Sequence, residues 1–308
     1  MTKRIAQIVL ALWLVVGLFG PLLATELPLA VRIDGTWRFP AFAGLVGERP
    51  EPPANGTWSD WWRAVPFDSE DVVWLAPIPF DPSNSDEARL YAGPSTEHPF
   101  GNDRSGRDVL ALIVHGASTA LEVAVFVVLF AGAVGVALGA IAGLRGGLVD
   151  SLVLRLVELS LCFPVVVAVL CVAAFVGRSQ SAVIVVLAAI YWTSFARIVR
   201  GEFLSLRERE FVATARGLGI GTPRLVLRHM LPCVLGQVGV VAAFVAASAI
   251  TVESTMRFLG LGASGVVSWG ELIAQFRVAT ASAWHLWLFP GLAIFSVVVA
   301  LHRVADVR

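Results

Sequence analysis

Ionisable side chains inside long apolar runs are the residues most able to carry chemistry in this chain. They are Glu122, Arg155, Glu158 and Glu253. Burying a charge in hydrocarbon is costly, so such residues usually face a protein interior or a water-filled cavity. Glu253 is the candidate for a side chain that lines a solute pathway, and the alternative is a structural ion pair or a hydrogen bond between helices. Arg155 and Glu158 are three residues apart, a spacing that favours a local pair on one helix.

Catalytic and metal-binding patterns do not occur in the sequence. An intramembrane enzyme would need paired aspartates within a span, H-E-x-x-H, or G-x-S-x-G with a partner His, and none is present. Cys162, Cys171 and Cys233 lack zinc-ligand spacing and are expected to act as small apolar residues. Lys3 is the only lysine, so a phosphate-binding loop of the G-x-x-x-x-G-K-S/T type cannot exist. We therefore expect no catalytic residue, metal or cofactor on this chain. If ATP drives this protein, another chain must hydrolyse it.

A polar stretch at residues 197–232 separates two apolar runs and predicts a helix-turn-helix. Residues 208–218 are mostly good helix formers, and Gly219 begins a glycine-rich turn. Thr222 followed by Pro223 predicts an N-cap with proline at the first position of a second short helix. Two short helices that meet at a glycine turn make a compact knob that a partner protein could push. The alternative is a basic loop held near anionic lipid by its arginines.

The composition indicates that membrane helices must position these residues. Of the 308 residues, 57% are hydrophobic and only 15% are charged, which is typical of a multi-span membrane protein. Six apolar runs are long enough to cross a hydrocarbon core of about 30 Å as helices. They are residues 5–23, 117–143, 148–176, 182–199, 233–259 and 284–301. The sequence therefore predicts an all-α polytopic membrane protein with about six transmembrane helices, the first of them a retained helix in preference to a cleavable signal peptide.

Basic residues fix the orientation of this six-span arrangement. Lys3, Arg145, the arginines of residues 197–228 and Arg303 all lie on one side of it, which by the positive-inside rule is the cytoplasm, together with both termini. Residues 25–108 then lie outside. They contain about twice as many acids as bases, and their many prolines and turn residues predict an irregular loop domain.

Tryptophans mark two further regions of the chain. The external cluster of Trp58, Trp61, Trp62 and Trp74 predicts either a small hydrophobic core for the loop or a surface that docks a binding protein or holds substrate. Trp269 and Trp284 lie between the last two spans and are expected to anchor at the lipid headgroups.

Small residues and prolines within the spans predict how the helices pack. Gly135, Gly139 and Gly143 are spaced four apart, a pattern that lets two membrane helices approach closely. Pro164 in the third run and Pro290 in the sixth are expected bending points.

The knob resembles the cytosolic loop motif of ABC importer permeases, written E-A-A, three residues, Gly, nine residues, I-x-L-P. The spacing from Gly219 to Leu231 and Pro232 fits this motif, while Ala213 and His229 stand where it has Glu and Ile. Further segments resemble, in the same order, the permeases of dipeptide, oligopeptide and nickel ABC importers. They are HPFGNDRSGRD at residues 98–108, FLGLG at 258–262, SWG at 268–270 and FPGLAIF at 289–295.

The resemblance implies a type I ABC importer permease fold in a bacterial inner membrane, of the C-type subunit and of a subgroup with a long first external loop. An N-terminal transmembrane helix would occupy residues 1–24 and an extracytoplasmic loop domain residues 25–108. Residues 109–304 would form a permease core of five transmembrane helices with a cytosolic coupling loop at 201–231, and residues 305–308 a cytosolic tail.

The resemblance also implies partners. With a second homologous permease, the chain would form the translocation pathway for peptides or similar small solutes. One or two ABC ATPase subunits would hold ATP and Mg and drive transport, and an extracytoplasmic substrate-binding protein would deliver the solute; no nucleic acid is expected. The first short helix would be a coupling helix, whose candidate contact residues are Glu210, Ala213, Thr214, Ala215, Gly217, Leu218 and Gly219. The alternative is an ATP-independent secondary carrier or channel, which would have no need of the knob.

Overall fold

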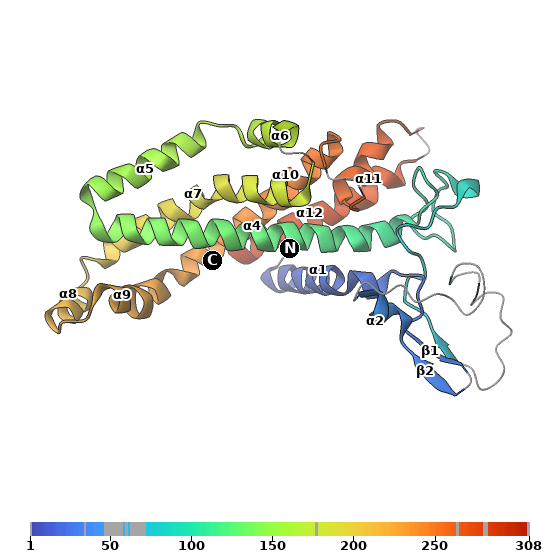
Figure 1. Ribbon diagram of the computed structural model, residues 1–308, viewed down its shortest axis with the longest axis horizontal. Helices are drawn as coiled ribbons and strands as arrows, with labels where there is room; N and C mark the ends of the chain where they lie inside the picture. Colours follow the sequence, from blue (N-terminus) through green and yellow to red (C-terminus); the bar gives the residue numbers. More distant parts are fainter. Residues whose placement is uncertain are drawn as a thin grey trace. The chain divides into compact units, whose positions relative to one another are not determined.

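The computed structural model describes residues 2–33, 35–45, 58, 61, 72–175, 178–262, 265–279 and 283–306 (Figure 1). The chain divides into two compact units. Unit 1 comprises residues 1–10, 122–264 and 296–308, and unit 2 comprises residues 11–121 and 265–295. Three helices contribute residues to both units, namely α1 (Lys3–Leu23), α4 (Val109–Arg145) and α12 (His285–Ala305).

The described helices confirm the prediction of a polytopic all-α protein. Five are long and apolar enough to cross a membrane. They are α1, α4, α7 (Gln180–Leu206), the continuous helix Thr222–Phe258 that ends in α10 (Leu231–Phe258), and α12. A sixth span is possible if the bent pair of α5 (Gly147–Leu161) and α6 (Val165–Phe175) crosses as one unit.

The third predicted span is not one straight helix. Instead α5 and α6 are bent by 77° at a short break, and Pro164 stands in that break directly before α6. Proline cannot donate a backbone hydrogen bond and clashes with the preceding turn, which explains why the helix ends here. By contrast, α12 continues through Pro290 without interruption.

Close packing of α4 on α7 organises unit 1. A Cβ atom added at Gly135 would lie 2.3 Å from the carbonyl oxygen of Trp192, and one at Gly139 would lie 2.6 Å from that of Ala196. At Gly143 the added atom would lie 2.6 Å from Cβ of Phe203. The predicted glycine contact surface is therefore confirmed, and its partner is a helix of the same chain.

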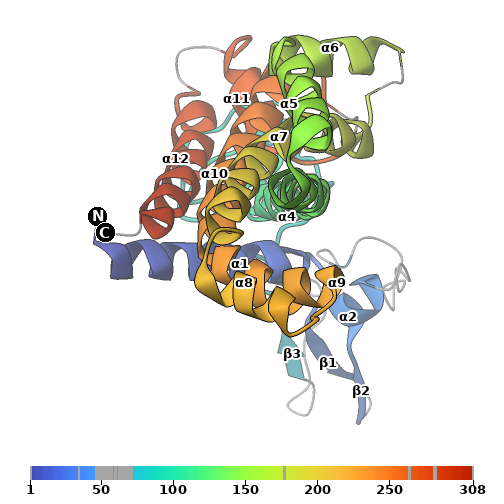
Figure 2. The same ribbon diagram turned by 90° about the vertical axis from the view of Figure 1, so that its left-hand side faces the viewer.

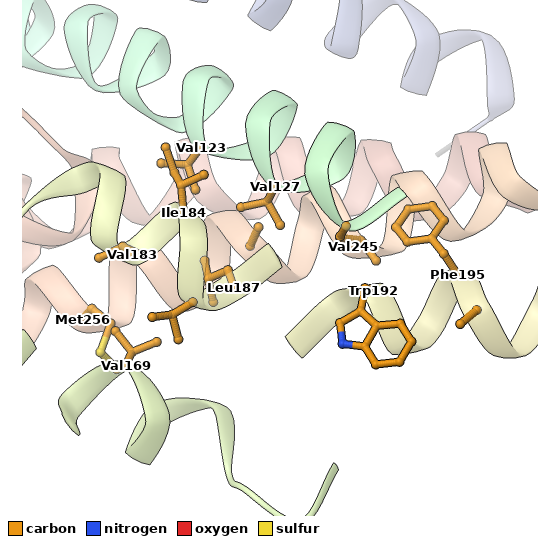
Figure 3. Close-up of a cluster of buried hydrophobic side chains, with 14 of the residues drawn as sticks. Val123, Val127, Val169, Val183, Ile184, Leu187, Trp192, Phe195, Val245 and Met256 are labelled. Atoms are coloured by element: carbon orange, nitrogen blue, oxygen red, sulfur yellow. The ribbon is translucent and has the colours of Figure 1, made fainter. Parts of the chain in front are cut away.

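A hydrophobic cluster fills the space where α4, α6, α7 and α10 meet (Figure 3). The buried side chains labelled there are Val123, Val127, Val169, Val183, Ile184, Leu187, Trp192, Phe195, Val245 and Met256. Branched aliphatic side chains dominate the cluster, as expected where helices pack by shape in an apolar surrounding.

Unit 2 contains a small antiparallel sheet that the sequence analysis did not predict. Figure 2 shows its strands β1 (Ala30–Ile33), β2 (Thr36–Arg38) and β3 (Val72–Trp74), and their order is β2-β1-β3. The helix α2 (Pro40–Leu45) and the 3₁₀ turn η1 (Glu87–Arg89) follow β2 and β3 respectively. The sheet is a minor addition to the predicted irregular loop domain. Its strands of three or four residues are too short to show an alternating pattern in the sequence.

The tryptophans between residues 58 and 74 take different roles. Trp58 and Trp61 are buried at 6% and 8% exposure against Val31, and their rings pack edge to face with centroids 5.4 Å apart. The predicted small hydrophobic core is thus confirmed for these two residues. Trp74 is 63% exposed on β3, and Trp62 lies outside the described residues.

Trp269 is the first residue of α11 (Trp269–Phe276), and the prediction that it anchors at the lipid headgroups was wrong. Its side chain is only 2% exposed, and its indole nitrogen donates a 2.9 Å hydrogen bond to the carbonyl oxygen of Ile113. A Cβ atom at Gly116 would lie 2.6 Å from the indole ring, so the absence of a side chain there makes room for it. Trp269 is a packing residue of unit 2, whereas Trp284 is 43% exposed.

Candidate functional site

The knob of the polar stretch begins directly after α7. Helix α8 (Glu210–Gly217) leads into a tight turn in which Gly219 has φ of +76°. The backbone amide of Ile220 donates to the carbonyl of Ala215 (3.0 Å), and that of Gly219 donates to the carbonyl of Arg216 (2.9 Å). These two bonds form a Schellman motif, in which a left-handed residue, usually glycine, closes the end of a helix. The predicted glycine turn is confirmed and has a defined geometry.

The second short helix differs from its prediction. Gly221 occupies the N-cap position, so Thr222 is the first residue of α9 (Thr222–Leu225) rather than its cap. A π-helical stretch, η2 (Val226–Met230), follows, and the chain then enters α10 without a break. The knob therefore consists of one short helix and the first turns of a long membrane helix. We call residues 207–230 the coupling segment.

One face of the coupling segment packs against the end of α7. Val212, Ala215, Leu225 and Met230 are 8% exposed or less and cluster with Phe203 of α7. Ala215 was predicted as a contact residue for a partner, but its side chain points into this cluster. Its contribution is to the packing that holds α8 in place.

The opposite face of the coupling segment is open. Of the seven predicted contact residues, six are exposed: Glu210, Ala213, Thr214, Gly217, Leu218 and Gly219. Leu218 has 76% of its surface exposed, and a Cβ atom added at Gly217 or Gly219 would meet nothing within 4 Å. Figure 1 shows α8 and α9 beside each other at one end of α7 and α10. The structure thus presents most of the predicted residues together on an accessible surface with small side chains.

An ion pair that the sequence analysis missed ties this end of α7 to α5. The guanidinium of Arg200 donates to both carboxylate oxygens of Asp150, with Nη2 2.6 Å from Oδ2. The partners are far apart in sequence, so no local spacing could have revealed them.

The ionisable residues within the spans form pairs with protein groups. Glu253 is 3% exposed and accepts a hydrogen bond of 2.5 Å from Nε of Arg257, one turn later on α10. Arg257 also donates to the side chain of Gln180 (3.2 Å), whose amide nitrogen donates to Glu122 (2.8 Å). Of the two alternatives for Glu253, the structural ion pair is the one observed. Its spacing of four residues from Arg257 was a signal that could have identified the partner.

Arg155 and Glu158 form the predicted local pair, with Nη1 2.8 Å from Oε2, on an exposed face of α5.

The positions of the potential metal ligands can also be compared. Among the residues that the structure describes, His, Cys, Asp and Glu do not gather into any group of three that could hold a metal ion.

The segments with family-like motifs in unit 2 converge in space. His98 and Asp108 are joined by a 2.8 Å hydrogen bond, and the other carboxylate oxygen of Asp108 accepts from the backbone amide of Ala111 at the start of α4. The ring of Phe100 stacks on that of Phe289 in α12, with centroids 4.0 Å apart. Buried polar groups that are hydrogen-bonded to one another favour one arrangement of the backbone, so this network defines where α4 begins.

Asp103 forms a second part of this network. Its carboxylate accepts from the Arg107 guanidinium (2.6 Å) and from the amide of Gln275 in α11 (3.3 Å). His285, the first residue of α12, lies with Nε2 3.0 Å from the backbone oxygen of Asn102. The motif residues at 98–108 are therefore a structural junction of unit 2.

Comparison with protein families gives one match that covers more than half of the chain. The family described as binding-protein-dependent transport system inner membrane component matches residues 135–307, a range that includes the whole coupling segment.

Individual relatives are similar over a longer part of the chain. A protein of Brucella suis biovar 1, whose name describes a peptide permease, is 37% identical over 238 residues, which are 76% of this chain and 78% of the relative. The dipeptide transport system permease protein DppC of Alkalihalophilus pseudofirmus is 36% identical over 215 residues, 70% of this chain and 71% of the relative.

A solved structure has a similar fold. It is an inward-facing conformation of the MetNI methionine ABC transporter, with a TM-score of 0.52 and 17% sequence identity. The match covers 64% of this chain and 96% of the matching chain.

Proposed function

The chain belongs to the family of inner membrane components of binding-protein-dependent transport systems, and we propose that it carries peptides or similar small solutes as one of two paired permeases. It is a multi-pass permease subunit of an ABC importer. Peptides are proposed as the solutes because relatives that are 37% and 36% identical to it over the aligned residues are named for peptide or dipeptide transport. The second permease would be a homologous chain.

The observation that carries this proposal is the open face of the coupling segment. Small and exposed side chains at Ala213, Thr214 and Gly217 would let a groove on an ATPase subunit approach the backbone of α8 closely. Separate ATPase subunits would hold the ATP and Mg that the cycle uses, since Lys3 as the only lysine excludes a phosphate-binding loop here.

The contacts of the coupling segment would transmit a movement of α8 to the membrane helices. The buried cluster of Val212, Leu225 and Phe203 joins α8 to the end of α7, and α9 continues into α10. When the ATPase grooves move on binding ATP, α7 and α10 would move with them. Alternating access to the two sides of the membrane would follow from that movement.

The orientation that fits this function places both termini and the coupling segment in the cytoplasm. The arginines at 207, 209, 216, 224 and 228 support it through the positive-inside rule. The sheet of β1 to β3 and the cluster around Trp58 and Trp61 would then face outward, on the side from which a substrate-binding protein delivers solute.

Purification of the tagged chain from its native membrane, with identification of the proteins that accompany it, tests the assembly. We expect a second permease and one or two ATPases. The variant Thr214→Glu adds a bulky acid on the open face of α8 and is expected to insert normally but to lose the ATPases and peptide uptake. The control Gly93→Glu adds the same side chain at an exposed position of unit 2 with nothing within 4 Å, and should retain them. Normal uptake by Thr214→Glu would contradict the coupling role.

A further inference from the structure

A hollow of about 480 Å³ lies on α7 and α10 in unit 1. Helix α7 contributes Tyr191, Ser194 and Arg197 to its lining, and α10 contributes Phe244 and Ser248 among aliphatic side chains. The lining thus combines one cation, three hydroxyl groups and an apolar wall. Its volume lies within the range of small-molecule sites, roughly 300 to 1,000 Å³.

The position of the hollow along α7 can be compared with the thickness of a membrane. At 1.5 Å per residue, Tyr191 is about 16 Å and Arg197 about 25 Å along α7 from its first residue, Gln180. A hydrocarbon core is about 30 Å thick. If α7 begins at one surface, the hollow extends from the middle of the core to the margin near the coupling segment.

Arg197 differs from the other arginines of α7 and α10. Arg200, three residues later, pairs with Asp150, and Arg257 pairs with Glu253. Within the described ranges of the chain, Arg197 forms no ion pair, and the lining of the hollow contains no Asp or Glu. The hollow therefore presents a positive charge that the described residues do not neutralise.

Such a charge is not expected to face lipid. An arginine within the hydrocarbon is costly unless it faces water or a protein partner, so we expect this side of α7 and α10 to border a wet cavity or another subunit. Ile198 and Phe244 at the same hollow are 43% and 45% exposed, which leaves the space accessible in the single chain.

We propose that this hollow binds the carboxylate terminus of a transported peptide, with Arg197 as the residue that holds the carboxylate. The inference rests on the proposed function. A guanidinium can bind a carboxylate through two parallel hydrogen bonds, and the hydroxyls of Ser194 and Ser248 can both donate to and accept from a peptide backbone. The apolar wall around Phe244 offers contact to side chains without requiring a particular one, which suits a carrier of varied peptides.

The position of the hollow links it to the coupling segment. Its two walls are the helix that enters the segment and the helix that leaves it. A movement of α8 would displace both walls. The strength with which Arg197 binds the carboxylate would change with the distance between the two helices. Binding and release of the peptide would then be timed by the same motion that opens the pathway.

Uptake into proteoliposomes by the complete complex is the first test, with L-alanyl-L-alanine and its C-terminal amide as probes. Arg197→Gln is expected to lower the rate for the free acid about tenfold at limiting peptide, the effect of losing one charged hydrogen-bond partner. The rate for the amide should change little, and Arg197→Lys should recover part of the loss. Arg155→Gln, which removes an arginine from an exposed local pair on α5, is the matched control and should behave as wild type.

A second measurement avoids the binding protein, which could itself reject the amide. Ser194→Cys is introduced after Cys162, Cys171 and Cys233 are replaced by alanine, and its labelling by a small thiol reagent is followed in the nucleotide-free complex. The free-acid dipeptide should slow the labelling several-fold, and the amide should not. In the presence of Arg197→Gln the protection should be lost.

Equal protection by acid and amide, or equal loss of both uptake activities in Arg197→Gln, would overturn the inference and assign Arg197 to an ion pair with the second permease. These results would leave the proposed function intact, because wild-type peptide uptake would still be present. A wild-type complex that hydrolyses ATP but imports neither peptide would instead overturn the proposed function, and the inference with it.

Discussion

Arg257 explains why Glu253 can be buried in α10. The two side chains are 5% and 3% exposed and meet one helical turn apart, so each neutralises a charge that would otherwise be costly in the membrane. From the sequence, Glu253 was a candidate for the solute pathway, with a structural ion pair as the alternative, because the sequence analysis did not identify Arg257 as its partner. Among the residues that the structure describes, Arg197 of α7 forms no ion pair, and the sequence analysis counted it among the cytosolic arginines.

Removing one member of the buried pair should destabilise the protein more than removing both. Glu253→Leu leaves Arg257 buried without its carboxylate and is expected to cost about 3 to 5 kcal/mol, whereas the double variant with Arg257→Met should cost much less. Thermal unfolding of the detergent-purified chain, followed by size-exclusion profiles, measures the difference. A double variant at least as unstable as the single one would contradict this account of the pair.

At the scale of elements, the spans were predictable because each is a run of apolar residues longer than any core helix of a soluble protein needs. The bend at Pro164 and the glycine contact between α4 and α7 also followed from residue type and spacing. The π-helical stretch η2 did not follow from residue type or spacing. The short strands and the burial of Trp269 depend on contacts between distant segments.

The glycines of α4 provide a test of helix packing with an internal control. Gly139→Ala would place Cβ 2.6 Å from the carbonyl oxygen of Ala196 and should destabilise the protein by about 1 to 3 kcal/mol through overpacking. At Gly132 the nearest atoms to an added Cβ are 3.8 Å away, so Gly132→Ala should be tolerated and could stabilise the helix slightly. The melting temperatures of the two variants in detergent measure both effects. Equal melting temperatures would show that α4 and α7 are less tightly packed than described.

At the scale of the whole molecule, family membership and the number of spans fit a permease subunit, and the distribution of charge supports the proposed direction of the chain across the membrane. The arginines of the coupling segment lie on the side that the positive-inside rule assigns to the cytoplasm. The substrate could not be predicted from the sequence, because the acidic external segment acts only through long-range charge, which salt screens over about 10 Å.

Labelling of single cysteines in intact cells tests the orientation. In a chain whose three native cysteines are replaced by alanine, Gly93→Cys should react with a membrane-impermeant thiol reagent added outside. Leu218→Cys, whose side chain is 76% exposed on the coupling segment, should react only after the cells are permeabilised. The reverse pattern would place the coupling segment outside and exclude its contact with a cytosolic ATPase.

The π-helical stretch η2 has a consequence for how such a protein can diverge. An extra residue in one helical turn rotates everything beyond it by about 100° relative to a regular helix. The rotation of the face of α9 that packs against α8, relative to the face of α10 that lines the hollow, is therefore set by η2 (Val226–Met230). Loss of a single residue in this stretch would turn Phe244 and Ser248 away from α7 while leaving both ends of the helix chemically unchanged. One insertion or deletion in η2 would therefore change how the residues that line the hollow are oriented relative to the residues that would contact the ATPase.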